Sequence, residues 1–435
     1  MSTPAMTAEN FVIPPLIKRN TILFALAQSF SGAGMQFAYG LGPLMVLALT
    51  GSAALAGLSV GLVGLSRFLA SYPVGKITDT YGRKPGVVFG LSLAMLGGVI
   101  CGTSMYFASI WVYIIGMTVF GMGMSGVQQL RVAATDMYPH FHRAQALGYL
   151  AMGSLIGLLF SPLIVAGTEK YALANGYEPL ALPWFCLPIL IVTGMGFVYF
   201  VRPDPKEIGM NLSHYYPGYV PPPRPKGSND KHFSARELLK NVHIRQAIVA
   251  NTAGQGNMSI VMVLTSLVLA HHGSSLASIA FSHVFHSAGM FAFTIPLGKL
   301  ADRFGREKVM YPGVFVSLVG AALVAFTDGS YWLVTLGTFL VGLGWAAGNV
   351  AATAMIADHV EVHQRGRAIG VNESCAGAVN VLMALVTGPI LQWWGLPMTG
   401  AVAVAVALPP LLLWAYYRVR PDPALMVNTP RPTLK

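Results

Sequence analysis

Charged residues are scarce in this 435-residue chain: they make up 10% of it, whereas hydrophobic residues make up 54%. Soluble domains contain about 25% charged residues, so this composition, with a mean hydropathy of +0.60, indicates a membrane protein. Acidic residues are fewer than basic ones: 16 Asp and Glu against 27 Lys and Arg, which gives a formal net charge of +11. The basic residues fall between apolar stretches and not along one face. This placement argues against a nucleic-acid partner and for a lipid bilayer.

Cysteine is also rare. Cys101, Cys186 and Cys375 each fall within an apolar stretch, and no two have the spacing of metal ligands or of a disulfide framework. The sequence lacks a phosphate-binding loop of the form G-x-x-x-x-G-K-[ST], so we do not expect ATP to drive the protein. No catalytic constellation stands out. We therefore predict that the chain is not an enzyme and that it carries no metal and no cofactor.

Apolar runs separated by short polar breaks make up most of the chain. Each has about the 20 residues that a helix needs to cross a bilayer, so we predict an all-α membrane protein with twelve transmembrane helices. The first six are expected near residues 21–49, 53–76, 84–106, 109–137, 143–168 and 180–201. The second six are expected near residues 244–270, 275–298, 308–327, 331–357, 366–392 and 396–418.

The segment 202–242, between the two sets of helices, is rich in proline, tyrosine and charge. Its three consecutive prolines at 221–223 cannot continue a helix, which predicts a linker. Ser234 and Glu237 match a capping box, so we expect a short surface helix over 234–241.

The basic residues predict how the chain is oriented. If the N-terminus is cytoplasmic, Lys170 is the one residue among 27 Lys and Arg that falls in a loop on the outer side. Basic loops stay in the cytoplasm, so we expect a cell (inner) membrane protein with both termini cytoplasmic. The expected parts are a tail over 1–20, a six-helix bundle over 21–201, the linker over 202–242, a second six-helix bundle over 243–418 and a tail over 419–435.

The two halves of the chain repeat each other. Gly75–Arg83 reads GKITDTYGR, and Gly298–Arg306, 223 residues later, reads GKLADRFGR, with five of nine positions identical. A second match, at an offset of 222, aligns Asp136, Arg143 and Gly148 with Asp358, Arg365 and Gly370. Repeated bundles of this kind indicate a solute site between the halves, near the bilayer midplane.

Gly75–Arg83 and Gly298–Arg306 resemble the G-x-L-a-D-r-x-G-r-k signature of the major facilitator superfamily, and the twelve spans extend the resemblance over nearly the whole chain. It implies two pseudo-symmetric six-helix bundles that carry a small-molecule solute by alternating access. Gly157 and Pro162 retain part of the fifth-helix pattern g-x-x-x-G-P of the drug–proton antiporter branch. Met117 replaces the arginine of that branch's fourth-helix pattern R-x-x-q-G-x-G, which leaves its coupling chemistry open.

Both copies of the signature contain residues that we expect to act in gating. Gly75 and Gly82 permit a tight turn and a close approach of helix ends, and Asp79 is placed to face the positive N-terminus of a neighbouring helix. Arg83 is expected to meet Asp136 when the cytoplasmic side closes, with a matching pair in the second half. Alternatively, these charges only fix topology and turn geometry. The gating candidates are Gly75, Asp79, Gly82, Arg83, Asp136, Arg143, Gly298, Asp302, Gly305, Arg306, Asp358 and Arg365.

Two glycine–proline elements are expected to bend helices. Gly157 with Pro162 is the element in the fifth helix, and Gly388 with Pro389 is the element in the eleventh. A role of either element in coupling is the alternative.

Ionisable residues inside apolar spans are costly and are therefore functional candidates. Arg67 lies near the middle of the second span, and Glu373 lies about two turns into the eleventh. The resemblance implies that these helices face each other, so we hypothesise an Arg67–Glu373 pair that closes the inner gate. Alternatively, Arg67 extends to the membrane surface and Glu373 binds backbone or water.

His283 and His286 lie one helical turn apart near the middle of the eighth span. An imidazole with an ordinary pKa near 6.5 can exchange protons during a transport cycle, so the pair is a candidate for coupling. Buried histidines with purely structural bonds are the alternative. A metal site is less favoured because no cysteine or carboxylate nearby completes a ligand set.

Polar residues on the first, fourth, seventh and tenth helices complete the candidates. The resemblance implies that these four helices line the cavity, so the residues are expected to contact solute; interhelical hydrogen bonding is the alternative. The cavity candidates are Gln28, Gln36, Arg131, Asn251, Gln255, Asn257 and Asn349.

The leading functional interpretation is a secondary transporter, functional as a monomer, that uses the proton gradient to export small apolar or cationic organic compounds. The alternative is a proton-coupled symporter that imports a metabolite or organic anion, with Arg67 or Arg131 meeting its carboxylate. A third interpretation is a transporter-like receptor that moves no solute.

Overall fold

Helices make up nearly all of the chain that the computed structural model describes, which comprises residues 12–139, 142–219, 235–327, 329–360 and 365–419. These residues contain no β-strand. The all-α class predicted from the apolar runs is therefore confirmed.

The first half forms one bundle of helices. Its elements are α1 (Pro15–Ser31), α2 (Ala33–Gly40), α3 (Gly42–Thr50), the 3₁₀ turn η1 (Ala53–Leu55), α4 (Leu58–Tyr81), α5 (Arg83–Tyr106), α6 (Ile110–Asp136), α7 (Arg143–Gly157), α8 (Phe160–Asn175) and α9 (Leu182–Phe200). The first membrane crossing is built from α1, α2 and α3 and is bent by 42° before α3. The fifth is built from α7 and α8.

The second half forms the other bundle. Its elements are α13 (Val242–His271), α14 (Leu276–Ala292), α15 (Thr294–Phe304), α16 (Glu307–Phe326), α17 (Tyr331–Asp358), α18 (Arg365–Ala407) and α19 (Pro409–Val419). One crossing is shared by α14 and α15. Between the bundles lie α10 (Pro205–Met210), α11 (Leu212–Tyr215) and α12 (Ala235–Leu238).

The number of crossings follows from helix lengths. Ten segments of the described chain are long and apolar enough to cross a bilayer, and the bent first crossing adds an eleventh. The last of the ten, Ala368–Val419, has 52 residues, whereas one crossing needs about 20. Its backbone leaves helical geometry at Gly395, with φ 77° and ψ −178°, so two helices meet there. The described chain therefore makes the twelve crossings that the sequence predicts.

One boundary differs from the prediction. The first helix begins at Pro15, inside the segment predicted as a tail, and proline is well suited to the first turn because it needs no backbone N–H partner there. The described part of the linker contains α10, α11 and α12. The last of these lies within the helix predicted over 234–241; Ser234, half of the predicted capping box, lies outside the described residues.

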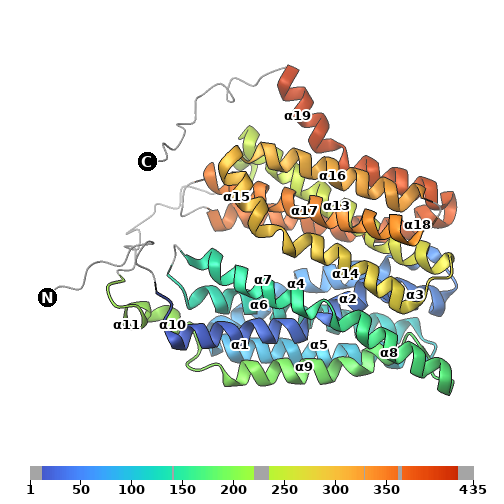
Figure 1. Ribbon diagram of the computed structural model, residues 1–435, viewed down its shortest axis with the longest axis horizontal. Helices are drawn as coiled ribbons and strands as arrows, with labels where there is room; N and C mark the ends of the chain where they lie inside the picture. Colours follow the sequence, from blue (N-terminus) through green and yellow to red (C-terminus); the bar gives the residue numbers. More distant parts are fainter. Residues whose placement is uncertain (1–11, 140–141, 220–234, 328, 361–364, 420–435) are drawn as a thin grey trace.

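Figure 1 shows the bundles as two layers, α1–α9 in one and α13–α19 in the other, with long helices running along a common direction. One end of these helices carries α10, α11, the start of α1 and the turn from α15 to α16, and we call it the α10 end. The opposite end carries α3 and the end of α8, and we call it the α3 end.

Close packing within each bundle depends on glycine. A Cβ built on Gly90 of α5 would lie 2.4 Å from the Cα of Gly126 on α6, so no larger residue fits at this crossing. In lipid no hydrophobic effect drives helices together. Close backbone contacts of this kind therefore supply part of the attraction between helices. Trp184 fills the adjacent core, with edge-to-face contacts to Phe37 and Phe120 at 5.8 Å and 5.5 Å between ring centroids.

Candidate functional site

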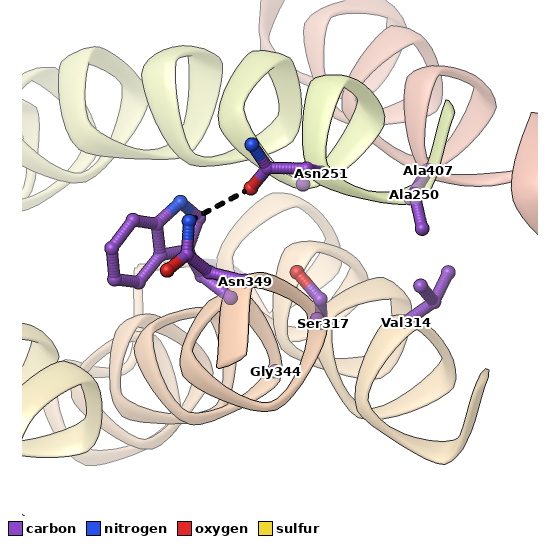
Figure 2. A pocket seen from close by; sticks show the side chains of 10 residues that line it. Ala250, Asn251, Val314, Ser317, Gly344, Asn349 and Ala407 are labelled. Carbon is purple, nitrogen blue, oxygen red and sulfur yellow. Dashed lines mark hydrogen bonds between the residues drawn. The ribbon is translucent and has the colours of Figure 1, made fainter. Parts of the chain in front are cut away.

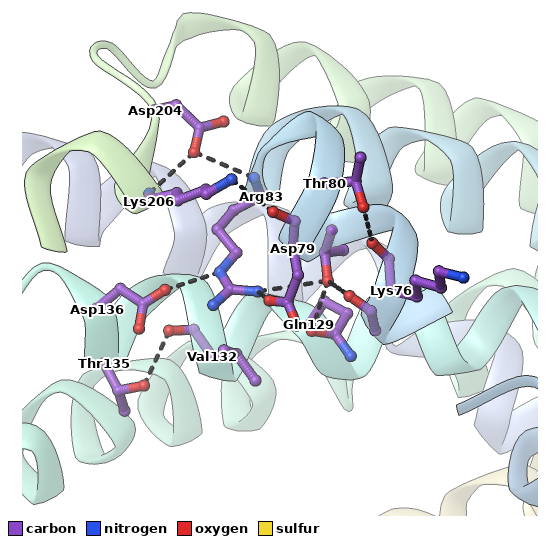
Figure 3. Close-up of polar contacts among 12 residues, drawn as sticks. Lys76, Asp79, Thr80, Arg83, Gln129, Val132, Thr135, Asp136, Asp204 and Lys206 are labelled. Atoms are coloured by element: carbon purple, nitrogen blue, oxygen red, sulfur yellow. Dashed lines mark hydrogen bonds and ion pairs between the residues drawn. The ribbon is translucent and has the colours of Figure 1, made fainter. Parts of the chain in front are cut away.

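Arg83 joins three helices at the first copy of the repeated signature (Figure 3). Its Nε donates to Asp136 Oδ2 at 2.7 Å and its Nη1 donates to Asp79 Oδ1 at 2.6 Å. Asp79 is in the last turns of α4, Arg83 begins α5 and Asp136 ends α6. The predicted Arg83–Asp136 pair is present, but both partners belong to one bundle. The pair therefore braces that bundle and does not itself connect the two halves.

Arg306 repeats this arrangement in the second bundle. Its Nε donates to Asp358 Oδ2 at 3.0 Å, and its Nη1 pairs with Asp302. Burial alone would lower the pKa of Arg306, but the hydrogen bonds to Asp302 and Asp358 raise it. The Asp358 side chain is 50% exposed and the Asp136 side chain 24%, so the first bundle's pair is the better shielded from solvent.

The turns at the two signatures use only the second glycine of each copy. Gly82 and Gly305 have φ of 108° and 102°, which side chains other than glycine rarely adopt. Gly75 and Gly298, predicted to serve the same turns, lie inside α4 and α15 instead. A Cβ on Gly75 would meet nothing in the described chain within 4 Å, so the expected close approach is wrong for this residue.

Asp79 was expected to face the N-terminus of a neighbouring helix, but in the structure it is the carboxylate of Asp204 that does so. Its Oδ1 accepts from the Arg83 backbone N–H at 3.1 Å, and its Oδ2 accepts from that of Lys84 at 3.0 Å. The same carboxylate caps α10 through the Lys206 N–H at 2.9 Å. Asp204 thus fastens α10 to the first turn of α5. Its sequence signal was the Arg-Pro-Asp-Pro run that ends both halves.

The remaining repeated residues have simpler positions. Arg143 begins α7 and is exposed, and Arg365 begins α18. A Cβ on Gly148 would lie 3.8 Å from the Ile295 side chain of the other bundle. One on Gly370 would meet no described atom within 4 Å. Neither glycine is required by close packing.

Glu373 lies where α18 faces the first bundle. Its carboxylate interacts electrostatically with Arg131 of α6 and Arg67 of α4, and accepts a hydrogen bond from Asn372 Nδ2 at 3.2 Å. Arg131 and Glu373 are both solvent-exposed although they lie on membrane-spanning helices. The predicted relation of Arg67 to Glu373 therefore includes a second arginine, which the sequence suggested only as a cavity residue.

A small, shallow pocket lies beside this cluster on the second bundle, among α13, α16 and α17 (Figure 2). Asn251, which also contacts Glu373, accepts a hydrogen bond from Asn349 Nδ2 at 3.0 Å. Trp345 completes this wall, and its indole N–H donates to Gln255 Oε1 at 2.6 Å. Three cavity candidates on α13 and α17 thus take part in two separate hydrogen-bonded pairs, one of which includes the Trp345 ring.

Other cavity candidates have different roles. Asn257 is fully buried, donates to the Ala403 carbonyl at 2.8 Å and accepts from Ser317 Oγ at 3.0 Å, so it is a bond between helices. Gln36 donates across the two bundles to Ser287 Oγ at 2.7 Å. The side-chain oxygen of Gln28 is buried without a hydrogen-bond partner among the described residues.

The two histidines are buried within the second bundle. His283 Nε2 lies 2.9 Å from Ser266 Oγ, and His286 Nδ1 lies 2.9 Å from the Thr338 carbonyl. A Cβ on Gly40 of α2 would lie 3.2 Å from the His283 ring, so this ring also packs against the first bundle. These bonds fit the structural interpretation of the pair, and it is His283 that reaches the interface.

The glycine–proline elements behave differently from each other. The fifth crossing is interrupted directly after Gly157, and α8 containing Pro162 follows. In contrast, α18 continues through Gly388 and Pro389 and is broken at Gly395. A Cβ on Gly388 would lie 2.1 Å from the Ala54 carbonyl oxygen. The glycine therefore permits contact between the bundles.

The α3 end is closed by contacts between the bundles that the sequence did not reveal. A Cβ on Gly57 would lie 1.6 Å from the Ala384 carbonyl oxygen. Gln392 Oε1 accepts from Ser52 Oγ at 2.8 Å and from the Ala54 N–H at 2.9 Å. On the other flank, Glu169 accepts from the backbone N–H groups of Leu276 and Ala277 at 2.9 Å and 3.0 Å. The sequence held one signal for Glu169: it is a carboxylate near a loop on the expected outer side, where few charged residues occur.

Two bundles of membrane-spanning helices, in contact at one end and with exposed charges between them toward the other, are an architecture typical of membrane transporters. The sequence profile described as Major Facilitator Superfamily matches residues 24–246 and 247–434, one match for each bundle. The chain belongs to this superfamily and is a multi-pass membrane transporter.

Several proteins are similar to this chain along nearly their full length. The MFS-type transporter YdeG of Bacillus subtilis is 28% identical over 417 residues, covering 92% of each chain. The riboflavin transporter RfnT of Brucella anthropi is 26% identical over 406 residues, covering 91% of this chain and 96% of its own. The multidrug resistance protein MdtG of Salmonella arizonae is 24% identical, covering 91% and 94%. Among solved structures, the nucleoside transporter NupG superposes with a TM-score of 0.68 at 13% identity, covering 94% of this chain and 100% of its own, which shows the shared fold.

Proposed function

We propose that the protein is a proton-coupled symporter for a small organic anion, with Glu373 as the proton carrier. The proposal rests on one cluster, in which Glu373 interacts with the two arginines Arg67 and Arg131 of the other bundle. With all three ionised, the cluster has one positive charge in excess, and protonation of Glu373 increases that excess. Charges at membrane depth require counter-charges, so the cluster favours an anionic solute.

Coupling follows from competition for the same guanidinium groups. A solute carboxylate and Glu373 both offer oxygens that pair with Arg67 and Arg131. When Glu373 binds a proton, its attraction for Arg131 is lost and the Arg131 guanidinium binds the solute. When the proton leaves, Glu373 recovers its partners and displaces the solute, so proton and solute travel together. We propose further that the α10 end, where the basic residues gather, faces the cytoplasm. Because the proton gradient across a cell membrane is directed inward, symport with protons makes the transport an uptake.

The polar wall beside the cluster supports a polar aromatic solute. Asn251 and Asn349 offer amide donors and acceptors, and Trp345 offers a ring for stacking. The relative RfnT is named a riboflavin transporter; riboflavin is heteroaromatic but has no carboxylate, so this relative supports stacking on Trp345 and not the binding of an anion.

A second candidate is proton-coupled export of apolar or cationic compounds, as the sequence first suggested. It is supported by the exposed carboxylate of Glu373, which can bind either a proton or a cation, and by the relative named multidrug resistance protein MdtG. In this mechanism cation and proton compete for one carboxylate and travel in opposite directions.

Transport in proteoliposomes distinguishes the two candidates. With the outside acidified, the full chain is expected to accumulate anionic or polar heteroaromatic probes together with protons. Arg131→Gln should weaken the apparent affinity about tenfold or more, since a charge-assisted hydrogen bond contributes about 1.5–3 kcal/mol. Glu373→Gln should abolish dependence on the pH gradient but retain downhill exchange. Arg418 is exposed at the end of α19, so Arg418→Gln is the control. Expulsion of cations against the same gradient, with no response to anions, would overturn the symport proposal.

A further inference from the structure

A second group of basic residues lies outside the interface, at the α10 end of the first bundle. An open groove of about 1070 Å³ runs between the start of α5, the end of α9 and α10. Its basic lining residues are Lys84, Arg202 and Lys206. In Figure 1, α9 lies on the outer margin of its bundle, away from α13–α19. The groove therefore includes the end of a helix that lies on the side of the first bundle away from the second bundle.

Lys84 and Arg202 are held close together although both are positive. The Lys84 ammonium lies 5.8 Å and the Arg202 guanidinium 5.7 Å from the ring centroid of Tyr199. The two charges also repel each other directly. The nearby carboxylate of Asp204, which accepts from backbone N–H groups of α5 and α10, offsets part of this repulsion. The Lys84 ammonium also donates to the carbonyls of Tyr199 and Val201 at 3.0 Å and 2.6 Å. An anion placed at Lys84 and Arg202 would relieve this repulsion.

The lining of the groove also changes from polar to apolar. Pro85 and Val88 continue it along α5, while Tyr81 and Tyr199 are 74% and 61% exposed. Exposed tyrosines are typical of the boundary between membrane and water, where the ring is apolar and the hydroxyl is wet. Asp204 and Glu207 are the acidic lining residues on the side of α10, and Glu207 is exposed. The groove thus offers basic groups at headgroup level beside an apolar wall.

The second bundle shows that the fold does not need a basic residue here. At the repeat offset of 223, Lys84 corresponds to Glu307, which has the opposite charge. Both residues occupy the first turn of the helix after a signature glycine turn. Lys84 is the last position of the signature pattern, and its basic charge is therefore present in the first copy and absent from the second.

We propose that this groove binds the phosphate-bearing headgroup of an anionic membrane lipid. Lys84 and Arg202 contact the phosphate, and an acyl chain follows the apolar wall at Val88. The groove is connected to the turn between α4 and α5. Lys206, which lines the groove, donates to the Asp79 backbone carbonyl, and Asp204 accepts from the first turn of α5. A phosphate held by a soluble metabolite has the same chemistry, and the experiment separates the two sources.

The test uses the purified full chain in neutral detergent and native mass spectrometry. Phosphatidylglycerol, phosphatidylcholine and inorganic phosphate are titrated separately. We expect phosphatidylglycerol to bind about fivefold or more tightly than phosphatidylcholine. Arg202→Gln should weaken phosphatidylglycerol binding about fivefold, the contribution of one basic side chain near an anionic lipid. Arg202→Lys should restore most of it. Arg418→Gln is the matched control, because Arg418 also stacks on an exposed ring, that of Trp414 at 5.2 Å, but lies on the other bundle.

Thermal unfolding of each variant in the same detergent verifies that it is folded. If Arg202→Gln is unstable, Lys206→Gln is measured in its place. Equal binding of the two lipids, or equal effects of the groove and control substitutions, would overturn the proposal. Displacement of the lipid by millimolar inorganic phosphate would assign the groove to a soluble phosphate compound and would likewise overturn it.

Discussion

Glu169 of the first bundle meets Leu276 of the second, with 2.9 Å between the carboxylate Oε1 and the backbone nitrogen. The second carboxylate oxygen accepts from Ala277 at 3.0 Å, so one side chain satisfies two free N–H groups at the start of α14. A carboxylate is favoured there because the first turn of a helix carries partial positive charge. This contact closes one flank of the α3 end, and Gln392 closes the other.

Loss of the Glu169 carboxylate is expected to open the α3 end. Glu169→Ala removes two charge-assisted hydrogen bonds, each worth about 1.5–3 kcal/mol, and should shift the equilibrium toward the state open at this end by tenfold or more. Spin labels on cysteines introduced at Lys170 and His271, in a chain whose own cysteines are replaced, report the separation by pulsed electron resonance.

The distance distribution should lengthen in this variant and change less in Glu169→Gln, which keeps one acceptor oxygen. Glu178→Ala provides the control, because Glu178 lies at the same end and its carboxylate accepts from the nearby Leu180 N–H of its own bundle. An unchanged distribution in Glu169→Ala would show that the contact does not hold the end closed.

Substitution at Gly57 is expected to prevent closure of the α3 end. The Cβ of Gly57→Ala would overlap the Ala384 carbonyl oxygen, and backbone cannot move aside as a flexible side chain can. Transport should fall at least about tenfold while the protein stays folded. Gly167→Ala on α8 is the control, since its Cβ meets nothing in the described part of the chain within 4 Å. Normal transport by Gly57→Ala would contradict the assignment of this contact to the transport cycle.

The two signature arginines should differ in their contribution to stability. Arg83 and Asp136 are 14% and 24% exposed, whereas Arg306 and Asp358 are 24% and 50% exposed. Solvent weakens exposed pairs to about 0–1 kcal/mol, and removing one partner of a better-shielded pair costs more. Thermal unfolding in detergent should therefore show a larger decrease in Tm for Arg83→Ala than for Arg306→Ala. The reverse order would contradict this ranking.

Substitution of Asn257 is expected to lower stability, whereas substitution of Asn349 is expected to weaken solute binding. Asn257→Ala leaves the Ala403 carbonyl and Ser317 without their partner in the core, which is expected to cost about 1–3 kcal/mol of stability. Asn349→Ala alters the polar wall and should raise KM with little change in Tm. Thermal unfolding and initial transport rates of both variants provide the comparison. A change in KM confined to Asn257→Ala would reverse the two roles.

The sequence by itself determined the class, the number of crossings and the duplication. Long apolar runs can be stable only in lipid, and their spacing counts the helices whatever their packing. The repeated signatures also predicted that Arg83 pairs with Asp136 and that Arg306 pairs with Asp358. Their spacing places each of these residues at the end of a helix, and the repeated architecture brings those helix ends together.

Tertiary structure alone decided which polar groups meet across the bundles. Arg131 joined Glu373, Glu169 reached α14, and Asn257 turned inward to the core, although all of them are polar residues on or beside apolar spans. The direction in which a helix residue points depends on how its helix is rotated and which helix packs against it, and a hydropathy pattern contains neither. The same holds for Gly57 and Gly388, which are indistinguishable in sequence from Gly75 until a neighbouring backbone approaches them.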